Sequence, residues 1–256
     1  MNTYHDLLKG DEWAVFGQFT TDQQAGKTRP EVQKAYPPDA KLIDLVPPEA
    51  FNVGTRPVID VIRERRSHRY FTDGALSLEE LSFLLWATQG VRGVSPDGTR
   101  YYRNVPSGGN RHPLETYLSI HRVEGVDVGL YRYLPLDHKL LLLRADQEVG
   151  TQVSQAALHQ SSSHEVKEFY FIQDCAVAFV WTAIPYRSEW RYTTAGSKLV
   201  AIDAGHICQN LYLACGALGL GTCSIGAINR KKMDAVLGVD GEEEFSFYAA
   251  PVGRVE

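Results

Sequence analysis

The sequence contains few of the residues that build metal sites or disulfide frameworks. Only four of its 256 residues are cysteines, and no two of them are spaced as a CxxC pair. All four lie in apolar surroundings, at Cys175, Cys208, Cys215 and Cys223. This use of cysteine is typical of reduced thiols in the core of a cytoplasmic protein. We therefore expect no metal site and a cytoplasmic location.

The chain also has no segment with the pattern of a secretory signal or a membrane span. Residues 1–10 contain no basic stretch that leads into an apolar run, so no secretory signal is visible. The longest apolar stretch, residues 199–220, is interrupted by Asp203, His206 and Asn210. Those polar groups favour a buried helix over a membrane span.

An excess of basic charge is absent as well. The 26 Lys and Arg residues are outnumbered by 31 Asp and Glu residues, which gives a net charge of −5. That balance excludes a general electrostatic surface for nucleic acid or anionic membranes, so functional basic residues must act locally. The content of 44% hydrophobic and 22% charged residues indicates an ordinary folded domain.

Two parts of the chain differ in their patterning. Residues 1–55 carry scattered prolines and little sustained periodicity, so we expect an extended arm laid over the core. Within this arm, residues 44–46 can pair at a sheet edge before Pro47 and Pro48 end the strand. Residues 56–256 are regularly patterned and form the predicted domain.

Helices are predicted where apolar residues recur at helical spacing between recognisable caps. Pro57 suits the first turn of a helix with an apolar stripe over residues 58–62, so the arginines that follow lie at its end. Ser77 and Glu80 form a capping box that starts a second helix. Further helices are expected over residues 148–160, over residues 199–218 with Gly219 as cap, and over residues 229–238.

Strands alternate irregularly with these helices. Residues 116–121 and 245–252 have strand patterns, and residues 130–133 and 139–144 form an expected hairpin. Residues 175–184 are continuously apolar, as in a central strand covered on both faces. Because strict βαβ alternation is missing, we predict a layered α+β domain rather than a doubly wound parallel sheet.

Two short motifs carry most of the functional information. The first is the arginine segment, residues 65–69 with the sequence Arg-Arg-Ser-His-Arg; the second is the glycine turn, residues 106–113 with the sequence Pro-Ser-Gly-Gly-Asn-Arg-His-Pro. Arginine binds phosphate through two parallel hydrogen bonds, and glycine lets backbone approach a ligand closely. Alone, each motif is more often a solvated helix end or a simple turn. Together they suggest a flat, phosphorylated cofactor.

In order along the chain, these motifs resemble those of the flavin-dependent nitroreductase superfamily, and within it the SagB-type dehydrogenases, which include azoline oxidases. The resemblance runs from about residue 42 to residue 254. Besides the two motifs above, it includes His112-Pro113-Leu114-Glu115, Gly129-Leu130-Tyr131-x-Tyr133, Asp203-Ala204-Gly205-His206 and Ser224-Ile225-Gly226.

This resemblance implies a three-layer α-β-α sandwich with a mixed, mainly antiparallel sheet, and an intertwined homodimer with FMN at each dimer interface. Arg65 and Arg66 would reach the phosphate and ribityl chain with Ser67 nearby, and Arg69 would face the N1/O2 edge of the flavin. A cation at that edge stabilises the negative charge of the reduced ring. Further expected FMN contacts are Pro106, Ser107, Gly108, Gly109 and Asn110 from the partner subunit, Ile225, Gly226 and Ala227 near N5, and Lys198 or Arg254 as a second phosphate cation.

The resemblance also implies candidate catalytic residues at Arg191 and Tyr192. The azoline dehydrogenases carry Lys-Tyr at this point, and a guanidinium is a poor base because it stays protonated. Tyr192 can still donate or accept a proton. The implied function is an FMN-dependent oxidoreductase that passes hydride through flavin N5, with NAD(P)H as candidate donor and a small molecule or modified peptide as substrate. The alternative is a catalytically degenerate flavin fold that acts as a scaffold in a peptide-modifying complex.

Overall fold

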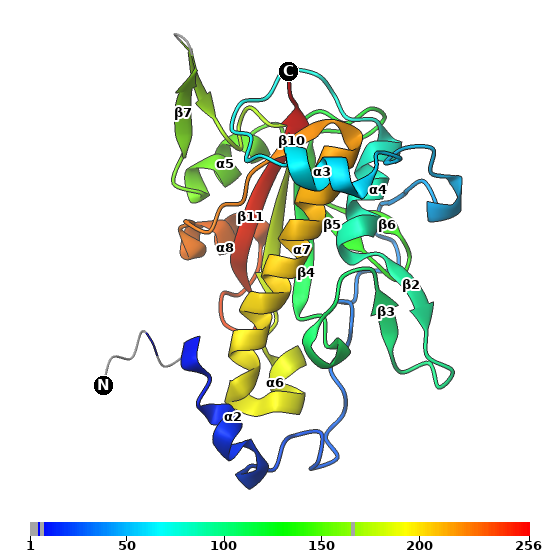
Figure 1. Ribbon diagram of the computed structural model, residues 1–256, viewed down its shortest axis with the longest axis vertical. Coiled ribbons are helices and arrows are strands. Elements are labelled where there is room, and N and C mark those ends of the chain that lie inside the picture. Colours follow the sequence, from blue (N-terminus) through cyan, green and yellow to red (C-terminus); the bar gives the residue numbers. More distant parts are fainter. Residues whose placement is uncertain (1–4, 6–7, 165–166) are drawn as a thin grey trace.

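The structure, a computed structural model, describes residues 5, 8–164 and 167–256. A seven-stranded sheet runs through its centre in the order β1-β6-β5-β4-β9-β11-β10 (Figure 1). These strands are β1 (Leu42–Asp44), β4 (Leu114–Ile120), β5 (Gly129–Leu134), β6 (Lys139–Ala145), β9 (Val177–Ala183), β10 (Leu220–Thr222) and β11 (Phe245–Arg254).

Every ladder of this sheet is antiparallel. The mainly antiparallel sheet that the sequence suggested is therefore confirmed. The parallel pairing within the described ranges is a single isolated bridge between Leu76 and Val123. Strand β9, predicted as the central strand, lies between β4 and β11 with all seven residues buried.

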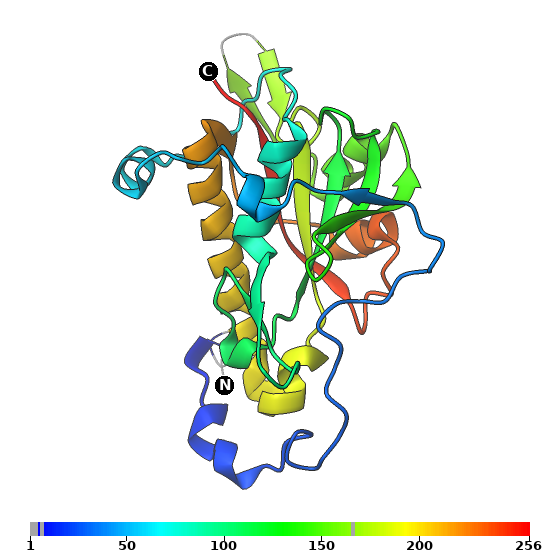
Figure 2. The ribbon, with the colours of Figure 1, turned by 90° about the vertical axis from the view of Figure 1, so that its right-hand side faces the viewer.

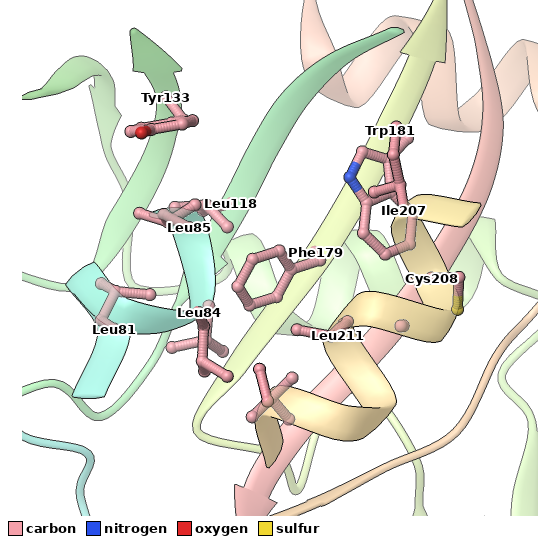
Figure 3. Close-up of a cluster of buried hydrophobic side chains, with 14 of the residues drawn as sticks. Leu81, Leu84, Leu85, Leu118, Tyr133, Phe179, Trp181, Ile207, Cys208 and Leu211 are labelled. Carbon is pink, nitrogen blue, oxygen red and sulfur yellow. The ribbon is translucent and has the colours of Figure 1, made fainter. Parts of the chain in front are cut away.

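Helices cover both faces of the sheet, which gives the three expected layers. One face packs against α4 (Leu78–Gln89) and α7 (Gly196–Leu218), and the other against α5 (Val149–Ala156) and α8 (Arg230–Leu237). Figure 3 shows the first interface, where Leu84, Phe179 and Leu211 meet. All four cysteines are buried and unpaired, as expected.

The helix ends follow the caps in the sequence. The Ser77 and Glu80 side chains each bond the other's backbone N–H, which completes the capping box of α4. Gly219 ends α7 in a left-handed conformation that a residue with a Cβ adopts at a cost. None of the helices within the described ranges is long and apolar enough to cross a membrane.

The short helix α3 (Val58–Glu64) departs from expectation. Its predicted apolar stripe does not face the core, because only Val61 is buried, while Val58, Ile59 and Ile62 are 64%, 61% and 61% exposed. A helix of two turns that lies on α7 can bury only one narrow side, so the rest of the stripe stays on the surface.

The first part of the chain runs outside the domain. It includes α2 (Glu12–Val15) and the turns η1 (Phe16–Gln18) and η2 (Pro48–Ala50), and it enters the sheet edge at β1 (Figure 2). Lys34 of this part bonds the Tyr117 hydroxyl and the Glu244 carboxylate. The division of the chain at residue 55 stays a prediction.

Two hairpins stand apart from the main sheet. They are β2 (Val91–Val94) with β3 (Tyr101–Arg103), and β7 (Ser161–His164) with β8 (Lys167–Tyr170). The remaining elements are η3 (Gly108–Asn110), α6 (Tyr186–Tyr192) and η4 (Thr193–Ala195), which lie near the beginning of α7 (Figure 1).

Candidate functional site

The arginine segment begins where α3 ends, at Arg65, and continues as extended chain. Arg65, Arg66 and Arg69 are exposed. Within residues 5, 8–164 and 167–256, no carboxylate lies within 4 Å of any of these three guanidinium groups. The segment therefore offers three cations that remain free to meet an anion.

Tyr212 of α7 connects this segment to the loop that follows β10. Its hydroxyl shares a hydrogen bond with Ser67 Oγ (3.0 Å) and accepts one from the Ser224 amide (2.9 Å). The Arg65 guanidinium lies 5.3 Å from the centre of the Tyr212 ring. In addition, the His68 amide donates to the Thr222 carbonyl (2.9 Å).

The Arg69 side chain reaches toward the same loop. Its guanidinium lies 5.9 Å from the Phe171 ring centre. Burial raises the pKa of the Cys223 thiol to about 11, and the charge of Arg69 opposes that rise. Arg69 is thus close to the start of the loop that holds Ile225, Gly226 and Ala227.

That loop presents backbone donors to its surroundings. Ile225 is fixed by two hydrogen bonds with Ala249, of 2.7 and 3.0 Å, and the Ala227 carbonyl accepts from Gln160 Nε2 (2.9 Å). The exposed amides of Gly226 and Ala227 have no acceptor among the described residues. The sequence-predicted arginines and the predicted N5 loop are therefore neighbours.

A cavity of about 410 Å³ opens beside the arginine segment. Arg65, Arg66 and His68 line it together with Arg56 and Tyr212. Burial and then the charge of Arg66 lower the pKa of His68, so its imidazole adds little positive charge at neutral pH. Glu64 and Glu256 also line the cavity, and Glu64 is ion-paired with Arg56, so its unpaired cations are Arg65 and Arg66.

The glycine turn is held by Asp203 of α7. One carboxylate oxygen of Asp203 accepts from Ser107 Oγ (2.6 Å), and the other accepts from the Gly108 amide (3.1 Å). Ser107 Oγ in turn accepts from the His112 amide (2.8 Å). Burial raises the pKa of Asp203, while these hydrogen bonds oppose the rise. Pro106, which precedes the turn, is exposed.

The turn and Tyr192 are in close contact. Gly109 is left-handed (φ 59°), and a Cβ at this position would lie only 2.2 Å from the Tyr192 hydroxyl oxygen. Asn110 and His112 also have positive φ, at 56° and 47°. Backbone conformation and the approach of Tyr192 therefore both favour glycine at 109.

The His112 ring is in hydrogen-bond contact with the Asn110 side chain. Burial lowers the pKa of His112 to about 2, so its imidazole is neutral, and its Nε2 lies 2.7 Å from Asn110 Oδ1. A neutral imidazole carries one N–H, so the ring and the Asn110 amide share a single hydrogen bond at this contact. This contact holds the Asn110 side chain within the turn.

The candidate catalytic pair lies at the end of α6. The Tyr192 ring packs against Trp13 and Phe16, with ring centres 5.5 and 6.3 Å apart. The Arg191 guanidinium lies 5.4 Å from the centre of the Tyr192 ring. The pair is therefore placed with the glycine turn rather than with the arginine segment.

The structure assembles the predicted residues into two groups at different places along α7 (Figure 1). The glycine turn contacts this helix at Asp203, and the arginine segment contacts it at Tyr212. Nine helical residues correspond to a rise of roughly 14 Å and to opposite sides of the helix. One chain thus does not bring the two groups together.

Two further predicted phosphate ligands are engaged elsewhere. Lys198 Nζ donates to the Leu8 carbonyl (2.5 Å), near the beginning of α7. The two terminal nitrogens of Arg254 donate to the Glu80 carboxylate (2.8 and 2.7 Å), and its Nε donates to the Ala75 carbonyl (3.1 Å). Their roles at a phosphate stay predictions: the charge of Arg254 is paired with Glu80, whereas the Lys198 ammonium is bonded to a neutral carbonyl.

Sequence reasoning assigned no role to Tyr212. The only signal for its position is the polar interruption of the apolar stretch 199–220, and a tyrosine does not stand out there. Asp203 belonged to a recognised motif, but its hydrogen bonds to a turn almost one hundred residues earlier require the folded chain.

The nitroreductase family model matches residues 62–254. The chain belongs to the nitroreductase family. Its sequence is 34% identical over 195 residues to MJ1384 of Methanocaldococcus jannaschii, a protein that is named as a nitroreductase. The match covers 76% of this chain and 89% of that relative. It is also 31% identical over 163 residues to the trifolitoxin-processing protein TfxB of Rhizobium leguminosarum, covering 62% of this chain and 41% of TfxB.

Solved structures share the nitroreductase fold. A nitroreductase-named protein of Ralstonia eutropha superimposes with a TM-score of 0.66 at 25% identity, over 88% of this chain and 94% of that one. A chain of the Escherichia coli microcin synthetase McbBCD complex, with truncated pro-MccB17 bound, superimposes with a TM-score of 0.57 at 20% identity. The match covers 98% of this chain and 93% of that one. The NADPH:FMN oxidoreductase of Vibrio harveyi complexed with NAD⁺ superimposes with a TM-score of 0.52 at 17% identity. The match covers 78% of this chain and 69% of that one.

Proposed function

We propose that this nitroreductase-family protein is an FMN-dependent oxidoreductase. The observation that carries the proposal is the group formed by the arginine segment and the loop after β10. Arg65 and Arg66 line a cavity, and Arg69 and the free amides of Gly226 and Ala227 belong to the same neighbouring segments. When bound, FMN supplies a hydride acceptor and donor at its N5 atom.

The residues fit the chemistry of that cofactor. Arg65 and Arg66 would bind the phosphate, because a guanidinium pairs with two phosphate oxygens at once. Arg69 would lie at the N1/O2 edge of the ring, where a cation stabilises added electrons. The Gly226 and Ala227 amides have no acceptor of their own and would approach N5.

The active form in this proposal is a homodimer. The glycine turn lies too far along α7 to reach the FMN bound by its own chain, so a second copy would present Gly109 and Asn110 to the ring. Exposed apolar side chains on α3 and α7, including Ile59 and Ile202, offer surface for such pairing.

Tyr192 would act on the substrate side, since it packs against the turn that covers the ring. Its hydroxyl can donate or accept a proton, whereas Arg191 stays charged and can only donate hydrogen bonds. Candidate substrates are small organic molecules and modified peptides, and NAD(P)H is the candidate donor. The likeness to TfxB and to the microcin synthetase chain supports the peptide class.

A second candidate function is a flavin-fold scaffold in a peptide-modifying complex. It is favoured by Arg191, which stands where the azoline dehydrogenases carry a lysine, because a permanently charged guanidinium cannot serve as their base. The two candidates differ in whether bound FMN can be reduced and reoxidised during turnover.

Purification followed by flavin spectroscopy tests the proposal. We expect the protein to bind FMN, and we expect NAD(P)H to reduce it and a quinone or nitroaromatic compound to reoxidise it. Bound FMN that no donor reduces would favour the scaffold. A colourless protein that cannot be reconstituted with FMN would contradict the oxidoreductase.

Arg66→Gln makes the test specific to the site. Loss of a charge-assisted hydrogen bond should weaken FMN binding at least tenfold, as measured by fluorescence titration. Because Arg66 is exposed, the free energy of unfolding should change by less than about 0.5 kcal/mol. Arg63→Gln is the matched control, since Arg63 is an exposed arginine of α3 whose partner is Asp60 (3.0 Å). Equal FMN affinities in the two variants would remove Arg66 from the cofactor.

A further inference from the structure

Four arginines gather around the candidate catalytic pair from distant parts of the sequence. Arg29 comes from the N-terminal part, Arg100 from the β2–β3 hairpin, Arg111 from the glycine turn and Arg191 from α6. Contacts bring their segments together: Arg29 donates to the carbonyl of Thr99, which precedes Arg100, and the Arg111 guanidinium lies over the ring of Trp190, which precedes Arg191. The charges of Arg100 and Arg191 accordingly act on Arg29, and those of Arg29 and Arg191 act on Arg111. We call these four residues the arginine cluster.

The cluster lacks neutralising partners. In the described ranges, no carboxylate oxygen lies within 4 Å of any of its four guanidinium groups. Arg187 also lies nearby, but its charge is paired with the buried Glu115 carboxylate. Asp97 is the carboxylate that acts on Arg29, and its own oxygen accepts from Ser95 and from the Thr99 amide.

The contacts of the cluster hold its guanidiniums in place without using up their donors. Arg29 donates to the Thr99 carbonyl, while its Nε is buried and has no partner among the described residues. Arg111 Nε donates to the Arg187 carbonyl (2.6 Å), and its guanidinium lies 4.7 Å from the Trp190 ring centre. The Trp190 indole is itself anchored to the Lys27 carbonyl (3.0 Å).

Gathering these cations carries an electrostatic cost. Burial, and then the neighbouring arginines, lower the pKa of Arg29 and lower that of Arg111 to about 10. Like charges held together in a partly buried place repel each other, and an added anion would relieve that repulsion. Uncharged side chains would fill the same space without this repulsion.

The position of the cluster relates it to the reaction. Arg191 directly precedes Tyr192, and Arg111, which is 2% exposed, directly follows Asn110 of the glycine turn. The cluster therefore adjoins both Tyr192 and the turn that would cover the flavin ring.

We propose that Arg29, Arg100, Arg111 and Arg191 form a subsite for an oxyanion, a carboxylate or a phosphate, carried by the molecule that exchanges electrons with the flavin. The proposal rests on the proposed function for the identity of that reaction. In this proposal Arg191 binds the oxyanion. A permanently charged guanidinium suits that role better than it suits the abstraction of a proton.

Anion binding can be measured without turnover, on FMN-saturated protein so that the arginine segment does not compete for the probe. Inorganic pyrophosphate is the probe, and its apparent dissociation constant follows from the rise in unfolding temperature as its concentration increases. We expect Arg29→Gln and Arg100→Gln to weaken this binding at least tenfold. Arg100 is exposed, so its variant keeps the test valid if Arg29→Gln fails to fold.

Two controls separate this subsite from the cofactor site. Arg92→Gln removes another exposed arginine of the same hairpin, whose Nε bonds the Arg103 carbonyl (3.3 Å), and it should leave pyrophosphate binding unchanged. Arg66→Gln should weaken FMN but not pyrophosphate measured on FMN-saturated protein. If Arg29→Gln and Arg100→Gln bind pyrophosphate as the wild type does, the subsite is refuted, whatever the outcome for FMN.

Turnover then identifies the source of the oxyanion. The KM values of 4-nitrobenzoate and 4-nitrobenzamide, and those of NADPH and NADH, are compared in the wild type and in Arg100→Gln. A KM that rises fivefold or more for 4-nitrobenzoate alone assigns the subsite to an acidic substrate. A KM that rises in this way for NADPH alone assigns the subsite to the phosphate of the donor. Equal changes for charged and neutral molecules would overturn the proposal.

Discussion

The two places where α7 meets the candidate site are built in contrasting ways. Near Tyr212, the arginine segment is exposed and its guanidiniums have no carboxylate partners. Near Asp203, the glycine turn is fixed by a largely buried carboxylate, with three consecutive hydrogen bonds and several left-handed residues. The donors of the first region are free to bind a ligand, whereas the hydrogen bonds of the second region fix the shape of the turn.

Paired glycine substitutions should reveal this contrast most strongly. In Gly109→Ala, the new Cβ would lie 2.2 Å from the Tyr192 hydroxyl on a left-handed backbone, so we expect a loss of about 3 kcal/mol in the free energy of unfolding. In Gly226→Ala, the nearest atom is 3.7 Å away, an ordinary contact, and stability should change by less than about 0.5 kcal/mol. Urea unfolding of both variants measures the difference.

A Gly109→Ala variant as stable as Gly226→Ala would mean that the glycine turn is not rigid. Adding Tyr192→Phe removes the closest atom, so the double variant should recover part of the lost stability. The absence of any recovery would point to the backbone conformation as the sole cause.

Acid should act on the glycine turn more than on the arginine segment. Unfolded histidine takes up a proton near pH 6.5, but folded His112 does so only near pH 2. The unfolded state therefore binds more protons between these values, and stability falls as the pH falls. From pH 7 to pH 5 the contribution of His112 is about 2 kcal/mol.

His112→Gln should flatten this part of the pH dependence, as measured by urea unfolding at the two pH values. The pKa of His68, beside the arginine segment, is also lowered, but its ring is less buried, so His68→Gln should flatten the dependence less. Equal slopes in wild type and His112→Gln would contradict the assignment of a neutral, buried imidazole.

The smallest expected effect concerns Arg254, whose guanidinium makes a bidentate pair with Glu80. Arg254→Lys keeps the charge but loses the fork, so we expect a loss of about 1 kcal/mol in stability and an FMN dissociation constant within about twofold of wild type. Glu80→Gln is the matched control, because it weakens the same pair from the other side. FMN binding that weakens only in Arg254→Lys would restore Arg254 as a phosphate ligand.

The long and strongly patterned elements were predictable from the sequence. The end of α7 at Gly219, the capping box of α4 and the buried strand β9 each follow from local signals that agree with the fold. Hairpin β7–β8 was not predicted, because its serine run has no alternation of polar and apolar residues.

The site was predictable only in part. The arginine segment and the loop after β10 were identified, and they do lie together. The exposure of Val58 and Ile62, the capture of Arg254 by Glu80, and the approach of Arg29 to Arg191 depend on tertiary packing between distant residues. Local patterns carry no information on such contacts.

The 23-residue helix α7 supports both parts of the candidate site, which makes its length as important as its composition. Each inserted or deleted residue would shift one end by about 1.5 Å and turn it by about 100° relative to the other. Asp203 and Tyr212 would then no longer face their respective loops together. The number of residues between Asp203 and Tyr212 therefore fixes the distance and the angle between the two parts of the site.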